Sequence, residues 1–119
     1  MDFKNNIPIY LQVINDIKHK ISLGELKLGE KLPSTRELAV KYQINPNTAV
    51  RVYSDMEGEG LCFTKRGLGT FVTEDEEKYL SVKKEMANEY VETFAENMRG
   101  LGLDIEAMIE LLRNHEKLK

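Results

Sequence analysis

Five polar side chains share one side of an expected helix that begins after Asn45. At about 100° per residue, the apolar side chains of that helix gather on the opposite side. The polar set includes an arginine and an asparagine, which can pair bidentately with the edges of guanine and adenine, respectively. A polar helix face is usually just solvated, so the meaning of this one depends on the elements around it. The five residues are Asn47, Thr48, Arg51, Ser54 and Asp55.

The chain shows no arrangement of residues that is typical of catalysis. It has no nucleophile with a nearby base, no phosphate-binding G-x-x-x-x-G-K, and no His and Cys set with metal-ligand spacing. The single cysteine, Cys62, excludes an internal disulfide, and it is expected to be a small buried apolar residue. The two histidines, His19 and His115, are far apart in the chain. We therefore expect no enzyme activity, no cofactor and no metal.

The length of 119 residues suits one compact domain with an extension. Hydrophobic residues make up 41% of the chain, and no apolar run approaches the roughly eighteen residues needed to span a bilayer. The amino terminus lacks a basic start followed by an apolar block. We therefore expect a cytoplasmic protein without a membrane partner.

Charge is distributed unevenly along the chain. Residues 1–72 hold ten Lys and Arg against eight Asp and Glu, a balance of +2, whereas residues 73–119 have a balance of -5. Attraction to phosphate falls off over roughly 10 Å at moderate salt. An acidic tail that points away therefore does not prevent the first part of the chain from binding DNA.

The first part of the chain predicts three helices. Apolar residues recur at helical spacing over 10–21, and Ser34 with Glu37 makes a capping box that opens a second, short helix. Asn45 can cap the third helix, and Pro46 suits its first position, where no backbone donor is needed. A short helix, a tight turn and a further helix form a helix-turn-helix arrangement.

Two strands follow, at 61–64 and 70–73, around a basic tip at 65–69 that contains two glycines. Three helices followed by such a hairpin make a winged helix-turn-helix. In that arrangement the third helix enters the major groove of DNA, and the hairpin tip lies on the backbone or in the minor groove. The expected fold class is therefore mainly α with a small β-hairpin wing (α+β).

Beyond residue 73 the chain predicts two more helices, separated by Gly100 and Gly102, with Asp104 capping the last. Their apolar stripes are too long for two helices to bury alone, so the tail either folds back or meets a second copy. A two-fold dimer suits a two-fold operator. We therefore divide the chain into a DNA-binding domain, 1–73, and a helical dimerisation tail, 74–119. The expected dimerisation residues are Leu80, Ala87, Tyr90, Val91, Phe94, Met98, Ile105, Met108, Ile109 and Leu112.

Three motifs lie within residues 7–73: LPSTRELA at 32–39, NPNT at 45–48 and RGLGTF at 66–71. Together they resemble the amino-terminal winged-helix domain of GntR-type bacterial transcription regulators. The tail, which contains MRGLGLDIEAMIELLR, is similar to that of the YtrA-like branch, whose members lack the large ligand-binding domain of longer relatives. The resemblance implies a homodimeric repressor of an inverted-repeat operator in double-stranded DNA, often encoded beside a transporter that it controls.

The resemblance also implies which residues contact DNA, from the second helix, the third helix and the wing tip. Many relatives place an arginine where this chain has Pro46, so a base contact from that position is unavailable here. Serine and threonine side chains near the helix starts suit phosphates, which position the domain without reading sequence. The expected set is Ser34, Thr35, Arg36, Asn47, Thr48, Arg51, Arg66, Gly67 and Gly69.

Other interpretations remain open for several of these residues. Arg51 could pair with Asp55 at i+4 on an exposed helix face, and Ser34 could serve only as a cap. The winged helix could instead bind a protein, in which case its recognition face should expose apolar residues. The sequence identifies no small-molecule effector.

Overall fold

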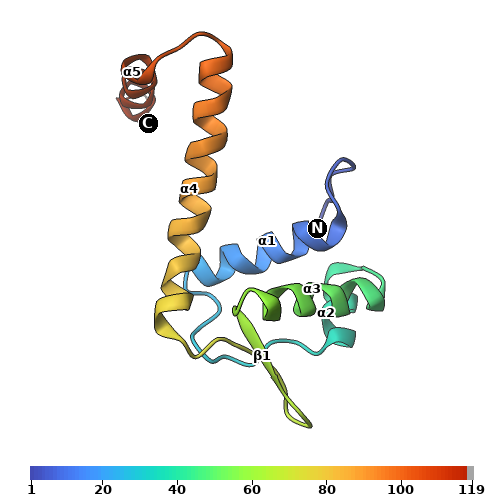
Figure 1. Ribbon diagram of the computed structural model, residues 1–119. Helices are drawn as coiled ribbons and strands as arrows, with labels where there is room; N and C mark the ends of the chain where they lie inside the picture. The colour runs from blue at the N-terminus through green and yellow to red at the C-terminus, as the bar shows by residue number, and fades with distance from the viewer. Residues whose placement is uncertain (118–119) are drawn as a thin grey trace. The chain divides into compact units, whose positions relative to one another are not determined.

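The computed structural model describes residues 1–117 (Figure 1). The chain divides into two compact units, which we call the first unit, Met1–Lys83, and the second unit, Lys84–Lys119. Helices and strands follow the predicted order and types. They are α1 (Ile9–Ser22), α2 (Thr35–Tyr42), α3 (Pro46–Gly58), β1 (Cys62–Lys65), β2 (Gly69–Val72), α4 (Glu76–Gly100) and α5 (Ile105–Lys117).

The core of the first unit lies between the first three helices and the hairpin. α3 packs against α1, α2 and β1, so it is held on several sides. Each helix turns its predicted apolar side inward, because burying these side chains is the main favourable contribution to folding. The buried residues are Val13, Ile14, Ile17, Ile21, Leu32, Leu38, Ala39, Tyr42, Ala49, Val52, Tyr53, Met56, Leu61, Cys62, Val72 and Val82.

The start of α2 and the turn between α2 and α3 confirm the local signals in the sequence. The Ser34 hydroxyl accepts from the Glu37 N–H at 3.1 Å, and the Glu37 carboxylate accepts from the Ser34 N–H at 2.9 Å. The Asn45 side chain accepts from the Asn47 N–H at 2.8 Å, and Pro46 is the first residue of α3. Gln43 ends α2 with a φ of 55°, a left-handed conformation that the sequence did not predict.

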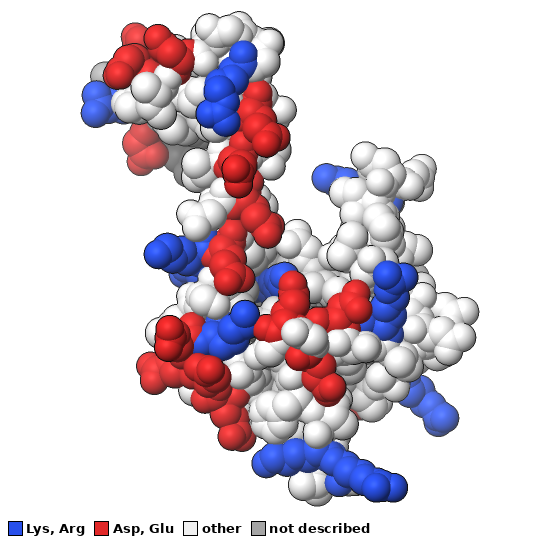
Figure 2. All heavy atoms as spheres, viewed as in Figure 1, with Lys and Arg blue, Asp and Glu red and all other residues white. Residues whose placement is uncertain are grey.

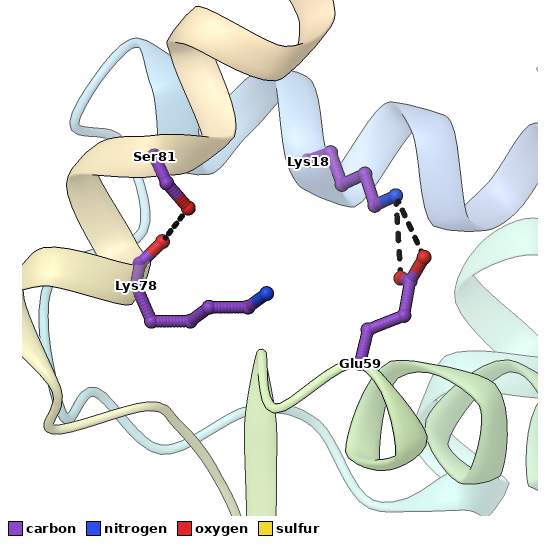
Figure 3. Close-up of polar contacts among 4 residues, drawn as sticks. All are labelled: Lys18, Glu59, Lys78 and Ser81. Atoms are coloured by element: carbon purple, nitrogen blue, oxygen red, sulfur yellow. Dashed lines mark hydrogen bonds and ion pairs between the residues drawn. The ribbon is translucent and has the colours of Figure 1, made fainter.

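Polar contacts tie α1 to its neighbours. The Tyr42 hydroxyl of α2 donates to Asp16 of α1 at 2.6 Å. Figure 3 shows Lys18 of α1 reaching Glu59, which follows α3, with a closest N–O distance of 3.2 Å. Lys78 of α4 extends into the same region (Figure 3). These contacts complement the apolar core by joining α1 to α2 and to the end of α3.

The hairpin is anchored by a third segment that the sequence did not predict. β1 and β2 pair antiparallel with Phe63 opposite Phe71, and Lys31 forms a bridge to Phe71. Leu32 N–H donates to the Thr70 carbonyl at 2.7 Å, which adds residues before α2 to the outer edge of β2. The wing is therefore attached to the chain segment that leads into α2.

Cys62 lies in β1 and is only 4% exposed, as expected for a small buried apolar residue. Its thiol donates weakly to the Tyr53 carbonyl, with an S–O distance of 3.7 Å. Burial disfavours the thiolate and raises the pKa of the Cys62 thiol to about 12. This cysteine therefore belongs to the core and is protonated at neutral pH.

α4 presents apolar side chains in two directions. Val82 and Met86 are buried, at 2% and 6% exposure, and the predicted stripe omitted both. Leu80 and Val91, which the stripe included, are 62% and 63% exposed. α4 includes Gly100, which was predicted to break it, and the interruption follows at Gly102. The Asp104 cap, which accepts from the Ala107 N–H at 3.0 Å, is as predicted. Within residues 1–117, no helix is both long and apolar enough to cross a membrane.

Candidate nucleic-acid interface

The outer face of α3 carries the expected polar side chains. Asn47, Arg51 and Ser54 are exposed, while Thr48 and Asp55 are half-buried at its border. The opposite face is fully buried: Ala49, Val52 and Met56 each have 0% exposure. Because core packing fixes the rotation of α3 about its own axis, the polar face is directed outward as a unit.

Arg51 is held by two neighbours. Its guanidinium carbon lies 3.7 Å from the centre of the Tyr10 ring, which comes from α1. Its Nε lies 3.8 Å from Asp55 Oδ2, which is an ion pair at i+4 but too long for a hydrogen bond. The Arg51 side chain is still 58% exposed. The pairing with Asp55 was one of the interpretations from sequence, whereas the contact with Tyr10 joins residues far apart in the chain and was missed.

Val50, which was not among the predicted site residues, is an apolar member of the same outer face. It is 53% exposed, and it lies about 60° around the helix from Asn47. The signal was present in the sequence, because position 50 is three residues after Asn47. Val50 offers a methyl-bearing surface among hydrogen-bonding groups, and apolar side chains can contact the methyl group of thymine in the major groove.

The start of α2 combines a cap with exposed polar groups. Hydrogen bonds from the backbone and then the side chain of Ser34 hold the pKa of Glu37 below its usual value. The Ser34 oxygen accepts in this cap, and its hydroxyl hydrogen can still donate to an anion. Thr35 is half-buried and Arg36 is exposed. Capping and phosphate binding are therefore compatible at Ser34.

The wing tip is a tight basic turn. Gly67 and Gly69 have φ values of 80° and 123°, which favour glycine. Arg66 is exposed, and the Lys65 ammonium lies 5.6 Å from the centre of the Phe63 ring. Figure 2 shows Lys and Arg gathered at the lower end of the view, where Figure 1 places the hairpin.

Lys31 joins this basic end of the hairpin from outside it. We call Lys31, Lys65 and Arg66 the basic wing. The sequence predicted the basic tip of the hairpin but not that Lys31 lies beside it. That connection depends on the bridge from Lys31 to Phe71, which pairs residues 40 positions apart.

Comparisons with known proteins agree with this geometry. Residues 9–72 match the family described as bacterial regulatory proteins, gntR family. The chain is 43% identical to the uncharacterized HTH-type transcriptional regulator YhcF of Bacillus subtilis (strain 168), over 91% of this chain and 89% of YhcF. It is 35% identical to the HTH-type transcriptional repressor YtrA of the same organism, over 100% of this chain and 88% of YtrA.

Solved structures also include a similar protein, a GntR family transcriptional regulator from Listeria monocytogenes. Its TM-score with this chain is 0.88 at 34% identity, covering 94% of this chain and 98% of that one. These relatives regulate transcription and are not enzymes, in agreement with the prediction from sequence. They also confirm the predicted winged-helix fold class. The chain belongs to the gntR family of bacterial regulatory proteins, and it is a DNA-binding transcriptional regulator.

Proposed function

We propose that this chain is a cytoplasmic, homodimeric repressor that binds an inverted-repeat operator in double-stranded DNA. The observation that carries this proposal is the combination, within the first unit, of an exposed polar face on α3 with the basic wing. In winged-helix proteins such a helix enters the major groove while the wing contacts the flanking backbone or minor groove. The first unit supplies both elements from one core.

The proposed contacts follow from the chemistry of the side chains. Asn47, Arg51 and Arg36 read base edges, because amide and guanidinium groups can form paired hydrogen bonds there. Hydroxyl groups and helix-start donors bind phosphates and set the register without reading sequence. Arg66 neutralises phosphate at the wing, where the two glycines allow close approach. The phosphate-binding hydroxyls are Ser34, Thr35 and Thr48, and the glycines are Gly67 and Gly69.

The dimer is proposed to form through the tail, 74–119. Several of its apolar side chains are exposed on the single chain: Leu80 at 62%, Tyr90 at 56%, Val91 at 63%, Ile105 at 60% and Leu112 at 55%. Apolar surface on this scale favours association with a partner surface, and a second copy presents the same one. Met108 is 5% exposed and so is already buried on the single chain.

Repression, rather than activation, is supported by similarity to YtrA, which is named a repressor. The resemblance to the YtrA-like branch further supports control of an operon that encodes a transporter. The proposal includes no assigned effector. Protein binding is the competing function, and the one exposed apolar side chain that favours it on the outer face of α3 is Val50.

A binding titration tests the function directly. The full chain is titrated with the DNA upstream of its own gene and with a scrambled duplex of equal length, at about 0.15 M salt. We expect a preference of roughly a thousandfold or more for the natural sequence. The same titration is run on a duplex enriched by the protein from a random-sequence library. Equal, weak binding to the enriched and scrambled duplexes would overturn sequence-specific recognition.

A further inference from the structure

The guanidinium of Arg51 rests on an aromatic ring supplied by a different helix. The distance of 3.7 Å from its carbon to the centre of the Tyr10 ring is that of close stacking. Attraction between a cation and an aromatic ring extends to about 6 Å, so this pair is well inside the effective range. Asp55 lies at the Nε side of the same group, at 3.8 Å. Arg51 is therefore restrained on one side by a ring and at one edge by a carboxylate.

Tyr10 is itself well placed to hold another residue. It is the second residue of α1, and it is half-buried. The side chain of Gln12 fixes the start of α1: it accepts from the Lys4 N–H at 2.9 Å and donates to the Lys4 and Ile7 carbonyls at 2.9 Å and 2.8 Å. α1 also packs along α3. The ring is thus part of a fixed support for the outer face of α3.

Stacking and base recognition use different parts of an arginine. The stacked contact with Tyr10 uses a flat face of the guanidinium, whereas its N–H bonds lie in the plane and project from the edges. Asp55 faces the Nε edge, which leaves the terminal nitrogens for a paired hydrogen bond to guanine. The 58% exposure of the side chain is consistent with an accessible edge. Arg51 can therefore remain on Tyr10 while it reads a base.

We propose that Tyr10 is a positioning residue for DNA reading, which holds the guanidinium of Arg51 in the orientation that the major groove requires. This inference rests on the proposed role of Arg51 in base recognition. An unsupported arginine samples many rotamers and loses that freedom on binding. The Tyr10 ring already restricts the rotamers of Arg51 in the free protein, so less conformational entropy is lost on binding. DNA binding should therefore be tighter and more selective with the ring than without it.

The test uses the full chain and a duplex that the wild-type protein enriches from a random-sequence library, with a scrambled duplex as reference. Tyr10→Leu removes the aromatic face and keeps an apolar side chain, whereas Tyr10→Phe keeps the face and removes the hydroxyl. Arg51→Ala and the double variant Tyr10→Leu/Arg51→Ala complete a mutant cycle. Such a cycle isolates the part of the Tyr10 effect that acts through Arg51.

We expect Tyr10→Leu to weaken binding to the enriched duplex roughly two- to fivefold, the range of an exposed cation–π contact. Tyr10→Phe should bind like the wild type. In the Arg51→Ala background, Tyr10→Leu should cause no further loss. Binding to the scrambled duplex should change less than binding to the enriched one.

Any other result contradicts either the role of Arg51 in base recognition or the positioning role of Tyr10. If Arg51→Ala binds like the wild type, the proposed role of Arg51 fails, whatever Tyr10 does. If Arg51→Ala is weakened but Tyr10→Leu is not, only the positioning role fails. Tighter binding by Tyr10→Leu would mean that the ring holds Arg51 away from DNA. An equal loss in Tyr10→Phe would assign the effect to the hydroxyl, and an equal loss without Arg51 would make it independent of that residue.

Folding is followed in parallel, because Tyr10 is half-buried. Thermal unfolding of each variant shows whether the first unit is intact at the assay temperature. Tyr10→Met is a second variant without the aromatic ring, and its flexible apolar side chain can fill irregular space. If Tyr10→Leu is unfolded, the same cycle is measured with Tyr10→Met, and a wild-type affinity in that variant would overturn the proposal.

Discussion

Lys31 lies against Gly69 at the tip of the wing, so close that a Cβ atom on Gly69 would lie 2.9 Å from Cε of Lys31. A side chain at position 69 would therefore displace Lys31. The φ of 123° at Gly69 also disfavours any other residue. Glycine is therefore required at position 69 for two reasons: it adopts the φ of the turn, and it leaves space for the Lys31 side chain of the basic wing.

The basic wing should supply binding that depends on salt more than on sequence. Replacing Arg66 with Ala should weaken binding to operator and scrambled DNA by similar factors, because phosphate contacts carry no direct sequence information. The slope of log K against log salt should fall in magnitude by about one unit. Arg113→Ala in α5 removes the same charge outside the wing and serves as the control. An unchanged slope for Arg66→Ala would exclude a phosphate contact there.

Val50 should contribute specificity through an apolar contact with a thymine methyl group. Uracil lacks that methyl, so thymine is replaced by uracil at one position at a time in an enriched duplex. At the contacted position the wild type should lose roughly three- to fivefold in affinity, the value of burying one methyl group. Val50→Ala should bind the two duplexes with similar affinity. A wild type that is indifferent to every replacement would contradict this role.

Phe94 should be part of the dimer interface in the tail. Replacing it with Asp places a charge in an apolar seam, where burial of an unpaired charge is strongly unfavourable. We expect the dimer to dissociate into monomers at micromolar concentration, measured by light scattering coupled to size-exclusion chromatography. Thr93→Asp introduces the same charge at an exposed position of α4, about 100° around the helix from Phe94, and this variant should remain dimeric. A dimeric Phe94→Asp would remove this residue from the interface.

Alkaline pH should destabilise the first unit, because it contains a buried thiol and buried tyrosine hydroxyls whose ionised forms are disfavoured in the core. Burial raises the pKa of Cys62 to about 12, whereas a thiol in an unfolded chain titrates near about 8.5. The stabilisation is therefore complete below about pH 8.5 and is lost as pH rises toward 12, because only the unfolded chain ionises readily. Burial also raises the pKa values of Tyr42 and Tyr53, so these residues also destabilise the folded state as pH rises, but at higher pH than Cys62.

The measurement is the urea midpoint of unfolding at pH values from neutral to about 10, the ordinary tyrosine range. The midpoint of the wild type should fall over this interval, and Cys62→Ala should show a shallower fall in its early part. Identical pH dependence in the two proteins would show that Cys62 makes no such contribution.

The features that could be predicted from sequence are those made by neighbouring residues. The capping box of Ser34 and Glu37 and the Asn45 cap each close within a few residues, so the residue types alone indicate them. The contact of Tyr10 with Arg51 and the bridge of Lys31 to Phe71 depend on how distant segments pack. Sequence spacing carries no signal for such contacts.

The apolar stripe of α4 was only partly assigned for a related reason. Helical periodicity groups apolar side chains by angle, but it does not say which group the single chain covers. Val82 and Met86 are covered, while Leu80 remains open to solvent. A helix with apolar side chains in two directions therefore needs the structure to separate its buried side from its exposed one.

Pro46 gives α3 a rigid start but contributes no side-chain hydrogen-bond donor at that position. Because this position cannot contact a base edge, fewer side chains of one copy read the DNA sequence. One half-site then specifies fewer base pairs and recurs more often by chance. A bacterial genome offers roughly a million or more competing sites, so a single copy would be diluted among chance matches. The proposed dimer would add a second half-site and so restore selectivity, and operator occupancy would then rise steeply with the cellular concentration of the chain.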